Sequence, residues 1–332
     1  MQRYILFVVA VLLGLSWLSP YHYTPWLTFS SELLAYAAAL CLLGLYIHRP
    51  LLLTKMHVPL LIMVLIPLIQ WVFGIEFYFN KALLSSLYLF AFAMMVILGS
   101  NLSHDPLQKQ QVFTGLCYTT LIAGLISVVI ALLQWLNLEQ GLWGTMQLRG
   151  NRPYANFAQP NNMATFLLMA LMACIYLFEK RKLATLWLFL GASLLIFTIA
   201  LSQSRTPWVA CIVLSVYLIL QRHQLQRFRV KHMLFGVALY TMCLVLIPAL
   251  NAILVQTGYS HSVMTGVIER ANSSHSRFNI WMQMIYAIQQ QPWFGYGWNQ
   301  TSVAQLAGAD FLQHNERTNS AHNWILEMLV WN

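Results

Sequence analysis

Long apolar runs follow one another along most of this chain. They occupy about residues 4–19, 26–47, 57–75, 82–100, 112–136, 161–178, 183–201, 206–220 and 233–255, and a tenth begins near residue 322. An α-helix needs about 20 apolar residues to cross a bilayer. The chain is 59% hydrophobic and 8% charged, whereas soluble domains are about 25% charged. The sequence therefore predicts an all-α polytopic membrane protein with about ten transmembrane helices.

The basic residues predict which side of the membrane each loop faces. Eleven of the 18 Lys and Arg residues lie on the side of the N-terminus, many of them in the loops 48–57, 179–182 and 221–232. Because Lys and Arg are enriched in short cytoplasmic loops, we expect these loops in the cytoplasm and segment 256–321 on the outer face. The net charge of +9 is spread over loops and does not predict nucleic-acid binding.

The runs and loops divide the chain into four segments. We expect five N-terminal helices in 1–136, a loop and four helices in 137–255, a large outer loop in 256–321 and the start of a tenth helix in 322–332. The last segment is too short to cross a bilayer, so we also expect the chain to be part of a longer protein. No cleavage motif follows the first run, which predicts a retained helix rather than a signal peptide.

The large outer loop is expected to contain an amphipathic helix at about 274–291. Apolar residues recur there at helical spacing, Ser273 or Ser274 can cap its start and Pro292 follows its end. Such a helix would lie along the membrane surface. Gly295 and Gly297 then predict a turn in which backbone can approach a ligand closely.

Arginines are unexpectedly frequent in the outer segments. Six are expected there: Arg149, Arg152, Arg205, Arg270, Arg277 and Arg317. Guanidinium groups bind phosphates through paired N–H donors, so this surplus predicts an anionic partner. Alternatively, Arg205 and Arg277 anchor the chain to lipid head groups, and Arg149 and Arg152 lie in a solvated, turn-rich loop. That loop ends at Asn161 and Asn162, which are expected to cap the sixth helix.

His322 stands at the start of the tenth apolar run, with Ser320 as the expected N-cap. A helix N-terminus disfavours a protonated imidazole and favours a nearby anion, so His322 is suited to act as a neutral base beside a phosphate. In the alternative, it hydrogen-bonds a loop carbonyl at the interface. Other histidines in the outer loop are His261, His275 and His314.

The sequence offers no pattern for a metal or nucleotide cofactor. The outward acidic residues have no paired spacing such as DxD: Glu76, Glu139, Glu269, Asp310 and Glu316. No P-loop occurs. All five cysteines lie inside apolar runs without CxxC spacing, which is typical of helix packing rather than of disulfides or metal sites. We expect neither metal nor cofactor.

Together these motifs resemble the bacterial O-antigen ligase superfamily. The resemblance rests on Arg205 in segment 202–208, Arg277 in segment 274–281, the Gly295–Gly297 turn in segment 292–298, and His322 with Asn323 in segment 321–324. Segment 150–162 is most similar to the protein O-oligosaccharyltransferases that glycosylate pilins and other periplasmic proteins. Many relatives have histidine where this chain has Gln159.

The resemblance implies a fold of the GT-C type in the bacterial inner membrane, with the active site facing the periplasm. It implies transfer of a glycan from an undecaprenyl-pyrophosphate donor to a hydroxyl of a periplasmic acceptor protein such as pilin. His322, Arg277 and Arg205 would be the catalytic residues. Substrate binding would involve further residues, namely Arg149, Arg152, Asn161, Asn323 and Gly297. Membrane lipids would be the remaining partners.

Other functions stay open at this point. The acceptor could be lipid A core, which would make the protein an O-antigen ligase, or another repeat unit, which would make it a polymerase. From a different class, a lipid-linked oligosaccharide flippase could use the same arginines to bind pyrophosphate. A flippase is expected to carry charges along its helices, whereas here Glu32 and Glu327 are the exceptions in nearly uncharged runs. Helices nearly free of charge, with the polar segments gathered on one side of the membrane, favour an enzyme over a flippase.

Overall fold

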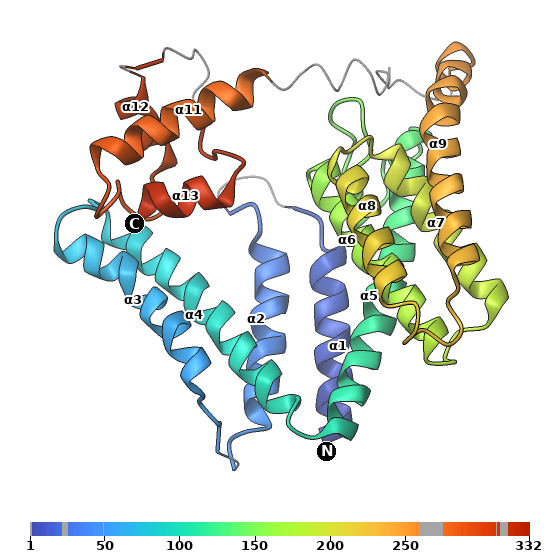
Figure 1. Ribbon diagram of the computed structural model, residues 1–332, viewed down its shortest axis with the longest axis horizontal. Helices are drawn as coiled ribbons and strands as arrows, with labels where there is room; N and C mark the ends of the chain where they lie inside the picture. Colours follow the sequence, from blue (N-terminus) through green and yellow to red (C-terminus); the bar gives the residue numbers. More distant parts are fainter. Residues whose placement is uncertain (1, 22–25, 49, 259–274, 310, 313–317) are drawn as a thin grey trace. The chain divides into compact units, whose positions relative to one another are not determined.

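The computed structural model describes residues 2–21, 26–48, 50–258, 275–309, 311–312 and 318–332. In these residues every regular element is a helix (Figure 1), which agrees with the predicted all-α class. The chain divides into two compact units, residues 1–49 with 102–267 and residues 50–101 with 268–332. The four segments defined from the sequence concern membrane topology and stay a prediction.

The first unit is a bundle of apolar helices. It contains α1 (Gln2–Leu18), α2 (Phe29–Gly44), α5 (Pro106–Trp135), α6 (Pro160–Glu179), α7 (Thr185–Leu201), α8 (Thr206–Leu220) and α9 (Val230–Gln256). Helix α6 packs between α5 and α7, and α9 lies against α7 (Figure 1). A Cβ atom added to Gly124 of α5 would lie 2.5 Å from the Cβ atom of Ala170 in α6. This pair of small residues lets the two backbones approach closely, as is common between membrane helices.

In its described residues, the second unit combines one long α-helix with four shorter α-helices and a 3-10 turn. It contains η1 (Lys55–His57), α3 (Val58–Val72), α4 (Phe79–Leu102), α11 (His275–Gln290), α12 (Thr301–Gly308) and α13 (Trp324–Trp331). Gln70 of α3 donates to the carbonyl of Trp331 (2.6 Å) and accepts from the backbone N–H of Trp298 (2.8 Å). One buried amide thus ties three segments of the unit together.

Five stretches of the described chain are long and apolar enough to cross a membrane: Lys55–Val72, α4, α5, α6 and α9. Helices α1, α2, α7 and α8 are apolar but have 15 to 17 residues. Their bounds follow the predicted apolar runs closely. The membrane character is supported, whereas the total of ten spans stays a prediction. The five cysteines are free, as expected from their positions in apolar runs.

The predicted capping of α6 by Asn161 and Asn162 is wrong. The helix begins at Pro160, and the N-cap position is held by Gln159, which makes no side-chain capping bond. Pro160 fixes the first helical residue because its ring sets φ and it has no N–H to satisfy. Asn161 therefore lies inside the first turn, where its side chain has a different partner.

The amphipathic helix predicted at 274–291 is present as α11 (His275–Gln290). Ser273 and Ser274, its expected capping residues, lie outside the described residues. Helix α12 was not predicted. Its Gly308 lies against α11, and an added Cβ atom there would be 2.5 Å from the carbonyl oxygen of Gln283. A close backbone contact at Gly308 and the buried Ala304, which belongs to the same apolar cluster as Met284, thus place the short helix against α11.

Candidate functional site

Gln134, at the end of α5, organises the loop that carries Arg149 and Arg152. Its side chain is 1% exposed. Its amide donates to the carbonyls of Met146 and Ala155, and its oxygen accepts from the N–H groups of Tyr154 and Ala155. All four hydrogen bonds are 2.8–3.0 Å long. The loop is therefore anchored in the unit at its middle and at its end.

Further contacts fix the part of this loop nearest the arginines. The hydroxyl of Tyr154 donates to the carbonyl of Gln147 and accepts from the N–H of Arg149. The buried amide of Asn156 donates to the carbonyl of Leu18 at the end of α1 (2.6 Å). Arg149 is exposed and Arg152 is half-buried. The loop is thus a well-bonded platform, not the freely solvated basic loop considered from its composition.

Arg205 follows a buried polar turn between α7 and α8. Ser202, Gln203 and Ser204 are all buried, and Gln203 adopts a φ of +47°, a conformation that residues other than glycine seldom take. The hydroxyl of Ser204 donates to the side-chain oxygen of Asn161 (2.8 Å). The structure therefore brings two predicted residues, Arg205 and Asn161, to neighbouring segments at one end of the first unit.

His322 lies in a strained turn of the second unit. Its φ is +53°, which is uncommon for any residue with a Cβ atom and costs about 1–3 kcal/mol unless surrounding contacts enforce it. The backbone N–H of His322 donates to the hydroxyl of Ser320 (3.1 Å). The side chain is exposed. A constrained backbone that presents an exposed imidazole is consistent with a reacting group.

Glu327 supplies the contacts that hold this turn. One of its carboxylate oxygens accepts from the hydroxyl of Ser320 (2.6 Å) and from the backbone N–H of Ala321 (2.8 Å). Hydrogen bonds to a carboxylate are stronger than those between neutral groups. Glu327 was predicted only as an unusual charge in an apolar run, and the structure shows that it orders the residues before His322.

The predicted N-cap of the last helix is wrong. The cap is Asn323, whose side-chain oxygen accepts from the N–H groups of Ile325 and Leu326. Ser320 instead bonds Glu327 and His322. His322 therefore lies just before the helix rather than within its first turn. Asn323 has a structural task here, and its expected contact with substrate stays a prediction.

Trp281 connects the helix of Arg277 to the turn of His322. Arg277 lies in the first turn of α11, and Trp281 follows four residues later, which places both on one face of that helix. The indole N–H of Trp281 donates to the carbonyl of Ala321 (2.8 Å). Within the second unit, the structure thus brings the Arg277 face of α11 to the residue next to His322.

Gly295 and Gly297 let the chain pass close to other backbone. Their φ values are +55° and +101°, and a Cβ atom on Gly295 would lie 2.5 Å from the carbonyl oxygen of Val330. A Cβ atom on Gly297 would lie 3.4 Å from the carbonyl oxygen of Ile75. Both glycines are therefore explained by packing within the unit, and substrate binding by Gly297 stays a prediction. Burial raises the pKa of neighbouring Tyr296, whose hydroxyl donates to the carbonyl of Ala287.

The predicted site residues fall into two groups. Arg149, Arg152, Arg205 and Asn161 belong to the first unit, and Arg277, Gly297, His322 and Asn323 belong to the second. Seven other residues considered in the outer loop lie outside the described residues: His261, Glu269, Arg270, Asp310, His314, Glu316 and Arg317. Among the described side chains, no group of three or more His, Cys, Asp or Glu is placed to hold a metal ion.

Two residues important for the geometry escaped prediction because their partners are distant in sequence. Gln134 lies inside a long apolar helix, and Trp281 looks like part of an amphipathic stripe. A polar side chain within a predicted span is the available signal for Gln134, since such groups need an internal partner. For Trp281 no sequence signal distinguishes its N–H from that of any interfacial tryptophan.

Comparison with known proteins supports the resemblance seen in the motifs. Residues 190–331 match the family model described as O-antigen ligase, and residues 153–178 match the one described as protein glycosylation ligase. The first match includes Arg205, Arg277 and His322, and the second begins within the loop that precedes α6.

Two curated proteins of Acinetobacter baylyi are similar to this chain. A general O-oligosaccharyltransferase is 43% identical over 335 residues, covering 100% of this chain and 59% of the relative. A ComP-specific O-oligosaccharyltransferase is 29% identical over 311 residues, covering 92% of this chain and 55% of the relative. The chain thus spans somewhat more than half the length of these relatives. No solved structure matches it.

Proposed function

We propose that this chain, which is similar to the O-antigen ligase family over residues 190–331, forms part of a protein O-oligosaccharyltransferase. The enzyme transfers a glycan from undecaprenyl pyrophosphate to a Ser or Thr hydroxyl of a periplasmic protein such as pilin. It resides in the bacterial inner membrane with its active site facing the periplasm. The observation that carries the proposal is the identity of 43% along the whole chain with a relative named a general O-oligosaccharyltransferase.

In the proposed reaction, the acceptor oxygen attacks the anomeric carbon of the first sugar. The bond from that carbon to the pyrophosphate oxygen breaks, and the pyrophosphate leaves with the electron pair. His322 takes the hydroxyl proton as general base. Its exposed side chain and constrained backbone support this role, because a general base must be held within hydrogen-bond reach of the proton.

Arg205 and Arg277 are proposed to bind the pyrophosphate and to offset its growing charge as it leaves. Arg149 and Arg152 are proposed to supply further positive charge for the substrate, on a loop that Gln134 keeps ordered. Asn161 lies beside the Arg205 turn through its bond with Ser204. Because guanidinium groups can supply the charge needed at the leaving group, the mechanism we propose is metal-independent.

The central test is glycan transfer by membranes that contain the full-length protein. We expect His322→Gln to lower transfer about 10²–10⁴-fold, the range of general-base catalysis, with normal membrane abundance and retained binding of the lipid-linked donor. His104→Gln is the matched control, because His104 is also an exposed loop histidine but lies on the predicted cytoplasmic side. Mass spectrometry of the acceptor would identify the product. Transfer at the parental rate by His322→Gln would overturn the assignment.

A further inference from the structure

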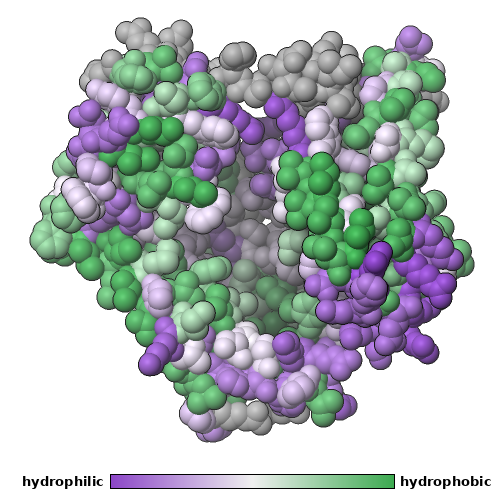
Figure 2. Space-filling view, viewed as in Figure 1, coloured by the Kyte–Doolittle hydropathy of each residue, from purple (hydrophilic) through white to green (hydrophobic). Residues whose placement is uncertain are grey.

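The end of the first unit opposite to Arg205 carries a concentrated positive charge. The loops after α6 and α8 and the first turn of α9 contain seven basic residues, Lys180, Arg181, Lys182, Arg222, Arg227, Arg229 and Lys231, whereas Glu179 is the acidic residue of this region. Figure 2 shows hydrophilic residues gathered at the lower right, around this end of the unit. The positive-inside rule accounts for the number of charges, but it does not account for their arrangement around a cavity.

Glu179 orders the basic loop instead of neutralising its arginines. Its carboxylate accepts from the backbone N–H groups of Gln226, Arg227 and Phe228 at 2.5, 3.0 and 2.9 Å. Arg227 turns inward, donating to the carbonyl of Phe178 (3.0 Å) with its guanidinium over the Phe178 ring. These contacts fix the loop and leave the side chains of Arg222 and Arg229 exposed to an external anion.

A basic pocket of about 270 Å³ is formed by this loop. Arg222, His223 and Arg229 line it together with apolar residues from the ends of α8 and α9. Paired guanidinium groups fit phosphate oxygens, which they can bind through several N–H donors at once. The shape and charge of the pocket therefore suit a phosphate group at the membrane surface.

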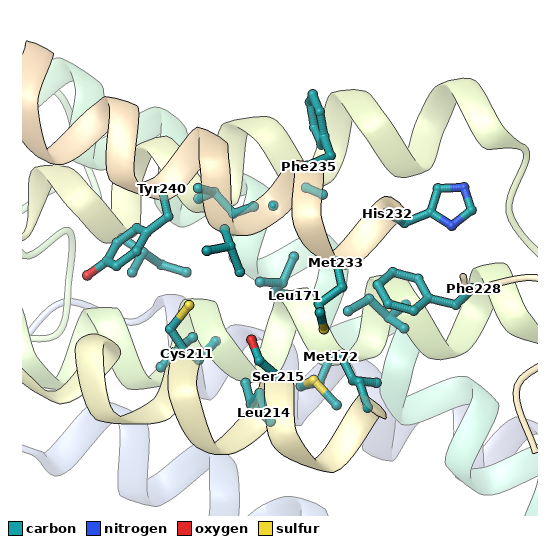
Figure 3. A pocket seen from close by; sticks show the side chains of 18 of the residues that line it. Leu171, Met172, Cys211, Leu214, Ser215, Phe228, His232, Met233, Phe235 and Tyr240 are labelled. Carbon is teal, nitrogen blue, oxygen red and sulfur yellow. The ribbon is translucent and has the colours of Figure 1, made fainter. Parts of the chain in front are cut away.

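An apolar cavity in the bundle adjoins the basic pocket. It is lined by residues of α6, α7, α8 and α9, and it shares Leu218, Phe228 and Met233 with the basic pocket. In Figure 3, Phe228 and His232 lie at one end of this cavity, and Cys211 and Tyr240 lie farther along it. Its volume of about 100 Å³ is of the order of an engineered apolar cavity of about 150 Å³ that binds benzene. Its size and apolar lining suit a segment of one hydrocarbon chain.

We propose that the two adjoining pockets form a binding site for an anionic membrane phospholipid. The phosphate lies between Arg222 and Arg229, and one acyl chain enters the cavity between α8 and α9. Basic pockets among membrane helices are known to bind such head groups. The site lies at the end of the unit opposite to Arg205 and does not depend on the proposed transfer reaction.

Native mass spectrometry of the full-length protein in detergent tests this site. The probes are phosphatidylglycerol and phosphatidylcholine with the same acyl chains. We expect the parent to retain one phosphatidylglycerol at least fivefold better than phosphatidylcholine, and Arg222→Gln with Arg229→Gln to reduce this preference to within twofold. Lys55→Gln with Lys109→Gln is the matched control, since both lysines are exposed on the same predicted face and neither lines the pocket. The control should keep the preference.

A second variant tests the acyl-chain cavity separately. Gly236 lines this cavity, and an added Cβ atom would make an ordinary 3.6 Å contact with Ile196. Gly236→Leu should fill the space and lower retention of both phospholipids at least threefold. The proposal would be overturned if the parent and the Arg222/Arg229 double variant retained phosphatidylglycerol equally well. Displacement of phosphatidylglycerol by equimolar polyprenyl phosphate would also overturn it, because the site would then hold a donor-type lipid.

Discussion

Removal of the Glu327 carboxylate should lower the rate of glycan transfer through His322, although His322 itself is unchanged. In Glu327→Ala, the Ser320 hydroxyl and the Ala321 N–H lose their acceptor. Each hydrogen bond to a carboxylate contributes about 1.5–3 kcal/mol. Ala321 is fully buried, so its N–H is left without a partner, whereas water can replace the partner of the half-exposed Ser320.

We therefore expect the ordered turn to lose about 2–3 kcal/mol, which corresponds to a fall of about 30- to 150-fold in its population relative to alternatives. If His322 reacts only from the ordered turn, the initial rate of glycan transfer falls by up to the same factor. Glu327→Gln keeps a neutral acceptor and should lose about fivefold. Binding of the lipid-linked donor and membrane abundance should change little in either variant.

Glu32→Gln is the matched control for this experiment. Glu32 is another carboxylate within an apolar helix, and it accepts from the side chains of Trp26 and Thr28 at the start of α2. It belongs to the first unit and has no part in the His322 turn. Transfer by Glu327→Ala within twofold of the parent rate would show that Glu327 does not position the reacting group.

Three further predictions address the anion site, topology and packing. Arg205→Lys and Arg277→Lys keep the charge but lose the paired donors, so transfer should fall at least tenfold at normal protein level; near-parental rates for both would indicate lipid anchoring instead. Reporter fusions at 179–182 should behave as cytoplasmic and fusions within 256–321 as periplasmic, and the opposite pattern would separate the proposed site from its donor. Gly308→Ala forces a shift of α12 from the backbone of α11 and should lower the free energy of unfolding by about 1–3 kcal/mol; an unchanged thermal midpoint in detergent would argue against that packing.

The helices were the predictable part of the fold. The run at 206–220 coincides with α8, and the stripe at 274–291 coincides with α11 to within one residue at each end. Apolar periodicity and prolines at helix ends are local signals, so sequence spacing is enough to detect them. Helix α12 was missed because it packs on α11 through contacts such as that of Gly308 with Gln283, which are 25 positions apart.

The candidate site could be predicted as a set of residue types but not as a geometry. Arg205, Arg277 and His322 stand out because charged residues are rare here. Their supporting contacts do not, since Ser204 reaches Asn161 across 43 positions and Trp281 reaches Ala321 across 40. The two capping errors have a local cause. In each case a neighbouring residue, Pro160 or Asn323, satisfied the helix start better than the residue chosen from the sequence.

The amide of Gln134 has a consequence for how salt titrations should be interpreted. An amide carries no charge and does not titrate in the usual pH range, and its four hydrogen bonds are shielded from solvent. Added salt weakens exposed charge pairs through screening but leaves such a neutral anchor intact. The loop that carries Arg149 and Arg152 should therefore keep its shape in high salt, and a loss of donor affinity under those conditions would report directly on phosphate contacts.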